Sequence, residues 1–306
     1  KFVDLPEDFT LAGASDINLT INGNAGNVTT VQAQARVPAL SLSGNSGLLA
    51  TEQLGLNVGL QLNMASLPWQ FDTTIKIDQG QMYVDPLLAD FTALPATLTA
   101  QGSYHPDSRQ LTIRHYDLNQ AQVAQVTGTM ALNFASQADT TASTLQSLTA
   151  QVHDAALEGL YKTYLQSLLV GTLADDMNAS GNIRGRIQYT PAAIQVALNL
   201  QKTTLIDAKK RFAIEGLDGD FYWDSAASLA QMRERNQLSV LSFNHARLYQ
   251  FPLSGSALKM VLADRDVALL EPAHIPVLDG ALHVAQFTVE NAGAEDMLLD
   301  FNATLE

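Results

Sequence analysis

The sequence contains no cysteine and has few positive charges. Among its 306 residues, Lys and Arg total 17 while Asp and Glu total 31, which gives a formal net charge of -14 at pH 7. The absence of cysteine excludes disulfides, thiolate metal sites and cysteine nucleophiles. Because nucleic-acid binding depends on clustered cations that neutralise phosphates, the charge argues against a nucleic-acid partner. For the same reason we expect any lipid contact to use an apolar surface rather than attraction to anionic headgroups.

Long hydrophobic runs are also missing. No segment approaches the roughly 18 to 20 consecutive apolar residues of a transmembrane helix. The first six residues, Lys1 to Pro6, lack the basic region, apolar run and cleavage site of a signal peptide. We therefore expect the chain to be one segment of a longer protein, whose membrane anchor or export signal lies outside these 306 residues.

Several stretches instead alternate apolar and polar residues with a period of two, which is typical of a β-strand with one apolar and one polar face. The longest of these apolar rows are Leu54, Leu56, Val58, Leu60, Leu62 and Met64, then Val126, Met130, Leu132 and Phe134, and later Ile194, Val196, Leu198 and Leu200. Clusters of Asn and Gly, such as residues 22–27, separate the stretches and favour tight turns. The sequence predicts a mainly β fold, an elongated and strongly twisted antiparallel sheet that curls into a groove or open barrel.

The alternation is interrupted once by a helical pattern. Apolar residues between Leu157 and Leu173 recur at spacings of three and four, which predicts one amphipathic helix of about four turns at about 157–174. We expect this helix to pack its apolar side on the sheet, and a weaker helical pattern spans 226–235. The chain is thus predicted to be one elongated β-groove segment, 1–306. It can be subdivided into an N-terminal β-sheet region (1–150), a helical insertion (151–177) and a C-terminal β-sheet region (178–306).

The sequence offers little catalytic chemistry. Its six histidines show no zinc-site spacing, and nucleophile-elbow, phosphate-loop and dinucleotide motifs are absent. The acidic pairs around Arg265 and Gly219 lack the further oxygen donors that calcium requires. We therefore expect no catalytic residue, no metal and no cofactor, and we predict that the protein is not an enzyme.

Three stretches near the C-terminus, residues 212–223, 238–253 and 275–287, carry a resemblance to a known group. The first contains Leu217-Asp218-Gly219-Asp220-Phe221 and the last contains Leu278-Asp279-Gly280-Ala281-Leu282. These stretches resemble the AsmA-like bacterial envelope proteins, most closely the YdbH type. Before residue 210, the resemblance rests only on the style of the alternating strands and on a composition rich in Ala, Leu, Asn and Gln. It implies a periplasmic segment tethered to the inner membrane of a Gram-negative bacterium, with an apolar groove, a role in phospholipid movement towards the outer membrane, and envelope protein partners.

We combine the pattern and the resemblance into one hypothesis. The protein binds or transfers lipid without catalysis, and acyl chains lie along an apolar β-groove while headgroups stay in water. The expected lining residues are Leu54, Leu56, Val58, Leu60, Leu62, Met64, Val126, Met130, Leu132, Phe134, Val196 and Leu198. Two alternatives stay open. One is a structural or adhesive cell-envelope β-protein with a closed core, and the other is a carbohydrate-active enzyme with two carboxylates facing each other across a cleft.

Overall fold

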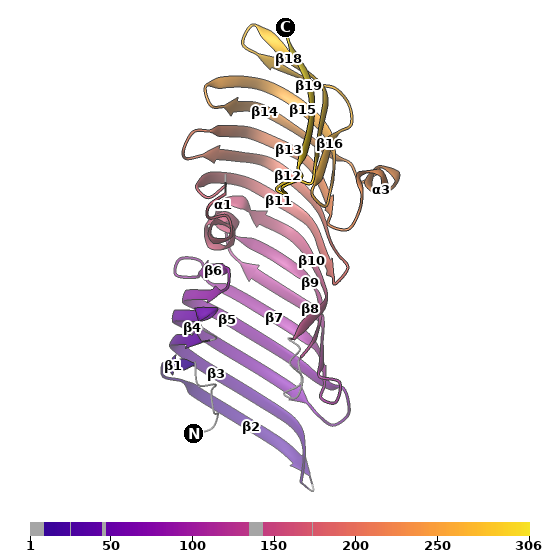
Figure 1. The fold of residues 1–306 in the computed structure, drawn as a ribbon. Helices are drawn as coiled ribbons and strands as arrows, with labels where there is room; N and C mark the ends of the chain where they lie inside the picture. Colours follow the sequence, from indigo (N-terminus) through magenta and orange to yellow (C-terminus); the bar gives the residue numbers. More distant parts are fainter. Residues whose placement is uncertain (1–8, 25, 45–46, 135–142, 173) are drawn as a thin grey trace. The chain divides into compact units, whose positions relative to one another are not determined.

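The computed structural model describes residues 9–24, 26–44, 47–134, 143–172 and 174–306, and most of them lie in β-strands (Figure 1). The strands are β1 (Thr10–Ala12), β2 (Asp16–Asn24), β3 (Asn27–Gly44), β4 (Leu49–Asn63), β5 (Trp69–Val84), β6 (Leu87–Asp90), β7 (Ala96–His105), β8 (Gln110–Gln120), β9 (Ala124–Asn133), β10 (Thr144–Ala156), β11 (Met177–Thr190), β12 (Ala193–Asp207), β13 (Phe212–Asp224), β14 (Ser239–Leu248), β15 (Phe251–Ala263), β16 (Asp266–Leu269), β17 (Ala273–Val277), β18 (Gly280–Glu290) and β19 (Leu298–Leu305). The strand pairs whose register is defined are antiparallel, and the sheet does not close on itself. The predicted mainly β, open antiparallel architecture is confirmed.

The chain divides into two compact units. Unit 1 comprises Lys1–Ala150 and Gly159–Val170, and unit 2 comprises Gln151–Glu158 and Gly171–Glu306. Strand β10 contributes residues to both units. The predicted subdivision at residues 150 and 177 stays a prediction.

Unit 1 is a meander in which most strands pair with the next one along the chain. Its long strands follow the order β2, β3, β4, β5, β7, β8 and β9. At one end of these strands, β1 also pairs with β3, and β6 pairs with β5. Such hairpin-connected strands satisfy each other's backbone groups locally, so the sheet needs no crossover connection.

Unit 2 repeats this arrangement from β11 to β16. Strand β18 then pairs with β16, β17 and β19. A short helix, α3 (Leu229–Glu234), connects β13 to β14, as the weaker helical pattern indicated. It begins with a capping box between Ser228 and Gln231 and packs Met232 against Val261 and Ala263. The helix therefore covers part of one face of the unit 2 sheet.

The main helical segment is shorter than the sequence predicts. It consists of α1 (Leu157–Leu160), the π-helical η2 (Tyr161–Leu165) and α2 (Gln166–Leu168), so it ends at Leu168 instead of about residue 174. The Leu169 amide donates to both Leu165 and Gln166, which tightens the last turn. Gly171 then adopts a positive φ of 81°, a left-handed conformation in which a helix stops. Leu173, the last residue of the predicted stripe, lies outside the described residues.

Candidate functional site: an open apolar face of the sheet

The strand register of unit 1 brings the apolar rows of separate strands together on one face. Residues that pair directly across antiparallel strands point to the same side of the sheet. One such row runs through Ile17, Ala35, Val58, Ile75, Leu98, Leu118 and Val126, and another through Ile21, Val31, Leu62, Phe71, Gly102, Ile113 and Met130. We call this side of unit 1 the apolar face. These two rows contain no charged residue and no side chain that can form a hydrogen bond.

The opposite face of the same strands is polar. One row there runs through Asp16, Arg36, Asn57, Lys76, Thr97, Asn119 and Gln125. A shift of one residue in any strand would move its apolar side chains to the polar face. Because apolar residues lie opposite apolar residues across all seven strands, the hydrophobic pattern specifies the register.

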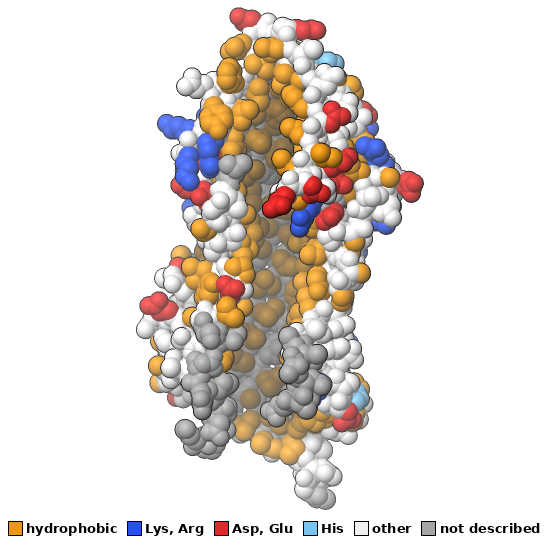
Figure 2. Space-filling model, viewed as in Figure 1, with side chains coloured by type: hydrophobic (Ala, Val, Ile, Leu, Met, Phe, Trp, Pro, Cys, Tyr) orange, Lys and Arg blue, Asp and Glu red, His pale blue; other side chains and the backbone are white. Residues whose placement is uncertain are grey.

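Among the residues that the structure describes, no second layer covers most of the apolar face. Val58, Leu60, Leu62, Ile75, Leu98 and Met130 are only half-buried, although each lies in the middle of a paired strand. Figure 2 shows a hollow with hydrophobic side chains on its floor in the part of the view that unit 1 occupies. A sandwich or closed barrel would bury such central side chains almost completely. In the described part of the chain, the face is therefore an open groove.

The helical segment closes one end of this face. A fully buried cluster forms there from Leu54, Ala89, Phe91 and Ala96, with Tyr164 of the helix packed against it. The Tyr164 ring lies 6.4 Å from that of Phe91. Its hydroxyl donates a 2.6 Å hydrogen bond to Oε1 of the buried Gln120, and burial raises the pKa of Tyr164 to about 12. The predicted packing of the helix on the sheet is confirmed for these residues.

Two glycines make room for aromatic rings that lie along the apolar face. Phe71 pairs with Gly102, and Tyr116 pairs with Gly128. The Tyr116 hydroxyl reaches across Gly128 and donates to the Thr149 carbonyl at 2.9 Å. A Cβ at position 128 would come within 1.8 Å of that carbonyl and 2.7 Å of the hydroxyl. The alternation pattern includes Gly128 in its row but gives no sign of this cross-strand contact.

Most of the predicted lining residues of unit 1 lie on the apolar face. Leu56, Val58, Leu60, Leu62, Val126, Met130 and Leu132 all occupy its directly paired rows. Met64 follows β4 and donates its amide to Thr29. Phe134 is 43% exposed and contacts Tyr104, which in turn contacts Trp69.

Leu54 differs from the other predicted residues because it is only 3% exposed and belongs to the buried cluster under the helix. The register shifts between Glu52 and Gly55, and Gln53 has a positive φ of 51°. This bulge changes the course of β4 before the strand enters the open part of the face. Leu54 thus supports the closed end of the groove and is not part of its accessible lining.

Val196 and Leu198 lie in unit 2, on an apolar face of that unit's own sheet. Val196 pairs with Ile187 and Trp223, and Leu198 pairs with Gly185 and Phe221. Hydrophobic side chains also line a hollow in the part of Figure 2 that unit 2 occupies. The aromatic residues Phe221 and Trp223, which share a strand face by sequence, are therefore placed beside two predicted lining residues.

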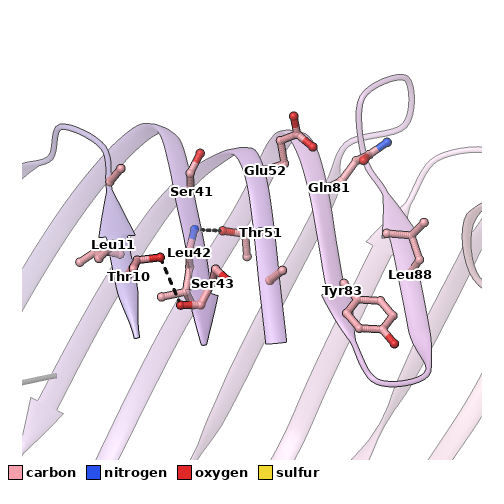
Figure 3. A pocket seen from close by; sticks show the side chains of 12 residues that line it. Thr10, Leu11, Ser41, Leu42, Ser43, Thr51, Glu52, Gln81, Tyr83 and Leu88 are labelled. Carbon is pink, nitrogen blue, oxygen red and sulfur yellow. Dashed lines mark hydrogen bonds between the residues drawn. The ribbon is translucent and has the colours of Figure 1, made fainter. Parts of the chain in front are cut away.

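A second concave region lies on unit 1 (Figure 3). It has a cavity volume of about 440 Å³ and is lined mainly by β1, β3, β4 and β5, with Leu88 of β6. Its polar contacts are local: Thr51 Oγ1 accepts from the Leu42 amide at 3.0 Å, and Thr10 Oγ1 donates to the Ser43 carbonyl at 3.5 Å. Among the described residues that line this trough, Glu52 is the only carboxylate, so these residues lack the paired acids that glycoside hydrolysis requires.

Other chemistry is sparse in the described part of the chain. No group of three or more His, Asp or Glu side chains there could hold a metal ion. None of the described helices has the length and apolar character needed to span a membrane. Comparisons with protein-family models, with curated proteins and with solved structures found no match.

Proposed function

We propose that this protein binds the acyl chains of lipids, without catalysing a reaction, along the open apolar face of its sheet. The observation that carries the proposal is the two paired rows of unit 1 through Val58 and Leu62, which are apolar from β2 to β9 and whose central members are only half-buried. An uncovered apolar surface of this size is unusual unless something binds to it.

The chemistry of the face favours a hydrocarbon over a sugar or a peptide. The rows through Val58 and Leu62 offer no donor or acceptor that could replace the water lost by a hydroxyl or an amide, and burying those groups unpaired is costly. In the row between them, the hydroxyls of Thr73 and Tyr116 already donate to the Gly59 and Thr149 carbonyls. A methylene chain has no such requirement and gains about 0.8 kcal/mol for each buried CH₂ group. The acyl chains would lie on the face, and the headgroup would remain in water at the ends of the strands.

We further propose a phospholipid as the ligand and a periplasmic, inner-membrane-tethered segment as the setting, on the strength of the AsmA-like resemblance of residues 212–223, 238–253 and 275–287. The half-buried rows favour this function over a structural protein with a closed core. The lack of a paired-acid cleft in the Figure 3 trough disfavours a glycosidase at that position.

The proposal is tested by identifying what the protein carries. The protein is purified from bacterial membranes under gentle conditions and extracted with organic solvent, and its lipids are quantified by mass spectrometry. We expect phospholipid well above the level in an unrelated acidic β-protein prepared in parallel.

A pair of variants localises the binding. Leu60→Glu places a charge in the middle of the apolar face and should abolish the enrichment. Gln34→Glu adds the same charge on the polar face, where its direct partners Asn18 and Gly59 are uncharged, and should leave the enrichment unchanged. Folding of both variants is checked by circular dichroism. Absence of phospholipid from the wild-type protein, or equal loss in both folded variants, would contradict the proposal.

A further inference from the structure

Two hairpin tips lie side by side at one edge of unit 2. The first connects β12 to β13, and the second connects β14 to β15. Phe212 pairs directly with Leu248, which brings the tips together. Two hydrogen bonds join them further, from Arg247 Nη1 to the Lys210 carbonyl at 2.8 Å and from the Tyr249 amide to the Arg211 carbonyl at 2.7 Å.

The second tip exposes large apolar side chains. Leu248 is 53% exposed, and Tyr249 and Phe251 are each 62% exposed. Leu248 and Phe251 pair directly, so they share a face with Phe212. Tyr249 occupies the first loop position with a φ of 53°, where two-residue hairpins favour Asn or Gly. A bulky aromatic residue is uncommon in this left-handed conformation.

The same edge carries four basic residues, Lys209, Lys210, Arg211 and Arg247, and two of them are paired with carboxylates. Lys209 forms an ion pair with Asp175 at 3.2 Å, and Arg211 forms one with the fully buried Asp207 at 2.7 Å. Asp176 adds a further carboxylate nearby, since its carbonyl accepts from the Ala208 amide.

Two cations remain beside the exposed apolar residues. Arg247 donates to the carbonyls of Lys210 and Tyr249, and neither Arg247 nor Lys210 has a carboxylate partner among the described residues. Figure 2 shows Lys and Arg side chains gathered at this edge of unit 2.

We propose that these two hairpin tips, residues 207–212 and 247–251, form a docking surface for an anionic lipid bilayer. Exposed aromatic and aliphatic side chains next to basic groups are typical of surfaces that enter the headgroup region, where rings bury their apolar part and cations meet phosphates. The net charge of -14 does not prevent local attraction, because charges farther away than about 8 to 10 Å are largely screened at physiological salt.

This inference goes beyond acyl-chain binding, since docking brings the protein to a membrane whether or not the apolar face of unit 1 holds a lipid. The test is flotation of the purified protein with vesicles of phosphatidylcholine mixed with phosphatidylglycerol, compared with vesicles of phosphatidylcholine alone. We expect binding to the anionic vesicles that weakens as salt is added.

Variants of the tips provide the decisive comparison. Tyr249→Asn removes the aromatic ring and suits the left-handed backbone, so it should abolish flotation without lowering stability. Leu278→Asn is the matched control, because Leu278 is also an exposed apolar residue at a hairpin turn of unit 2, with a φ of 55°. Lys210→Gln should weaken binding to anionic vesicles about fivefold, the effect of one cation near a charged membrane. Lys202→Gln, an exposed cation with a similar φ of 49°, should leave it unchanged.

The outcomes separate docking from lipid binding by the groove. Leu60→Glu should still float, since it lies on unit 1 and not at the tips. Unchanged flotation of Tyr249→Asn and Lys210→Gln, or wild-type protein that does not bind anionic vesicles, would overturn the docking surface. Loss of flotation in Leu60→Glu alone would place the membrane contact on the apolar face and would also overturn it.

Discussion

Gly128→Ala tests the packing on which the apolar face depends. The new Cβ would lie 1.8 Å from the Thr149 carbonyl oxygen and 2.7 Å from the Tyr116 hydroxyl, so β9 and β10 must separate or the tyrosine must move. Overpacking of this kind costs about 1 to 3 kcal/mol. Loss of the hydrogen bond from Tyr116 to Thr149 adds about 0.5 to 1.5 kcal/mol. We expect the free energy of unfolding of unit 1 to fall by roughly 2 to 4 kcal/mol.

The measurement uses the two tryptophans of the chain. Trp69 lies in unit 1 and Trp223 in unit 2, so a Trp223→Phe background leaves Trp69 fluorescence as a reporter of unit 1 in urea unfolding. Gly59→Ala is the matched control, because a Cβ there meets nothing within 4 Å. This variant should leave the free energy of unfolding unchanged or raise it by about 0.4 to 1 kcal/mol, because alanine reduces the conformational entropy of the unfolded chain. Equal midpoints for the two variants would refute the cross-strand contact at Gly128.

Three further predictions concern buried polar groups and sheet edges. Tyr164→Phe leaves buried Gln120 without its hydroxyl partner and should destabilise unit 1 by about 1 to 3 kcal/mol in the same unfolding assay. Because the folded-state pKa of Tyr164 is raised to about 12, wild-type stability should also fall as pH rises from about 10 to 12, a loss absent from the variant. Hydrogen bonds from Arg211 lower the pKa of Asp207 in the folded protein. The ionised Asp207 therefore stabilises the fold fully above the pKa of an unfolded aspartate, about 3.9, and this contribution is lost as the pH falls below that value. In Asp207→Asn, the temperature of thermal unfolding should fall less at acid pH than in the wild-type protein. An unchanged pH dependence would contradict this prediction. Finally, β2 exposes Ile17 (65%) and Leu19 (58%) at a sheet edge, which favours self-association. Leu19→Lys should reduce the sedimentation coefficient at high protein concentration, and a wild-type protein that remains monomeric would refute this prediction.

The fold was predictable where each residue's environment depends only on alternation along its own strand. The row from Leu56 to Leu62 shows this, because a period of two assigns every side chain to one face regardless of which strand lies alongside. The prediction fails at Leu54, where the left-handed Gln53 shifts the register. It also fails at the end of the helix, where the leucine spacing continues but Gly171 stops the helix.

Contacts between separate strands could not be read from the pattern. Tyr116 and Thr149 are far apart in sequence, and Gly128 gives no signal of the ring that crosses it. The hairpin tips of unit 2 were missed for a related reason. Net charge averages over the whole chain, whereas the position of Lys210 beside Arg247 depends on the pairing of β13 with β14.

The separation of charge from the apolar rows gives the proposed functions a common physical basis. A lipid has two parts with opposite solvation requirements, and a protein that handles it must offer each part a suitable surface. The rows of unit 1 through Val58 and Leu62 provide hydrocarbon contact without a polar side chain to desolvate. Cations beside aromatic side chains occur instead at hairpin ends such as Lys210 and Tyr249, where water remains available to the headgroup. An added charge should therefore abolish acyl-chain binding on the apolar face, whereas at the hairpin tips the removal of a charge should weaken membrane contact.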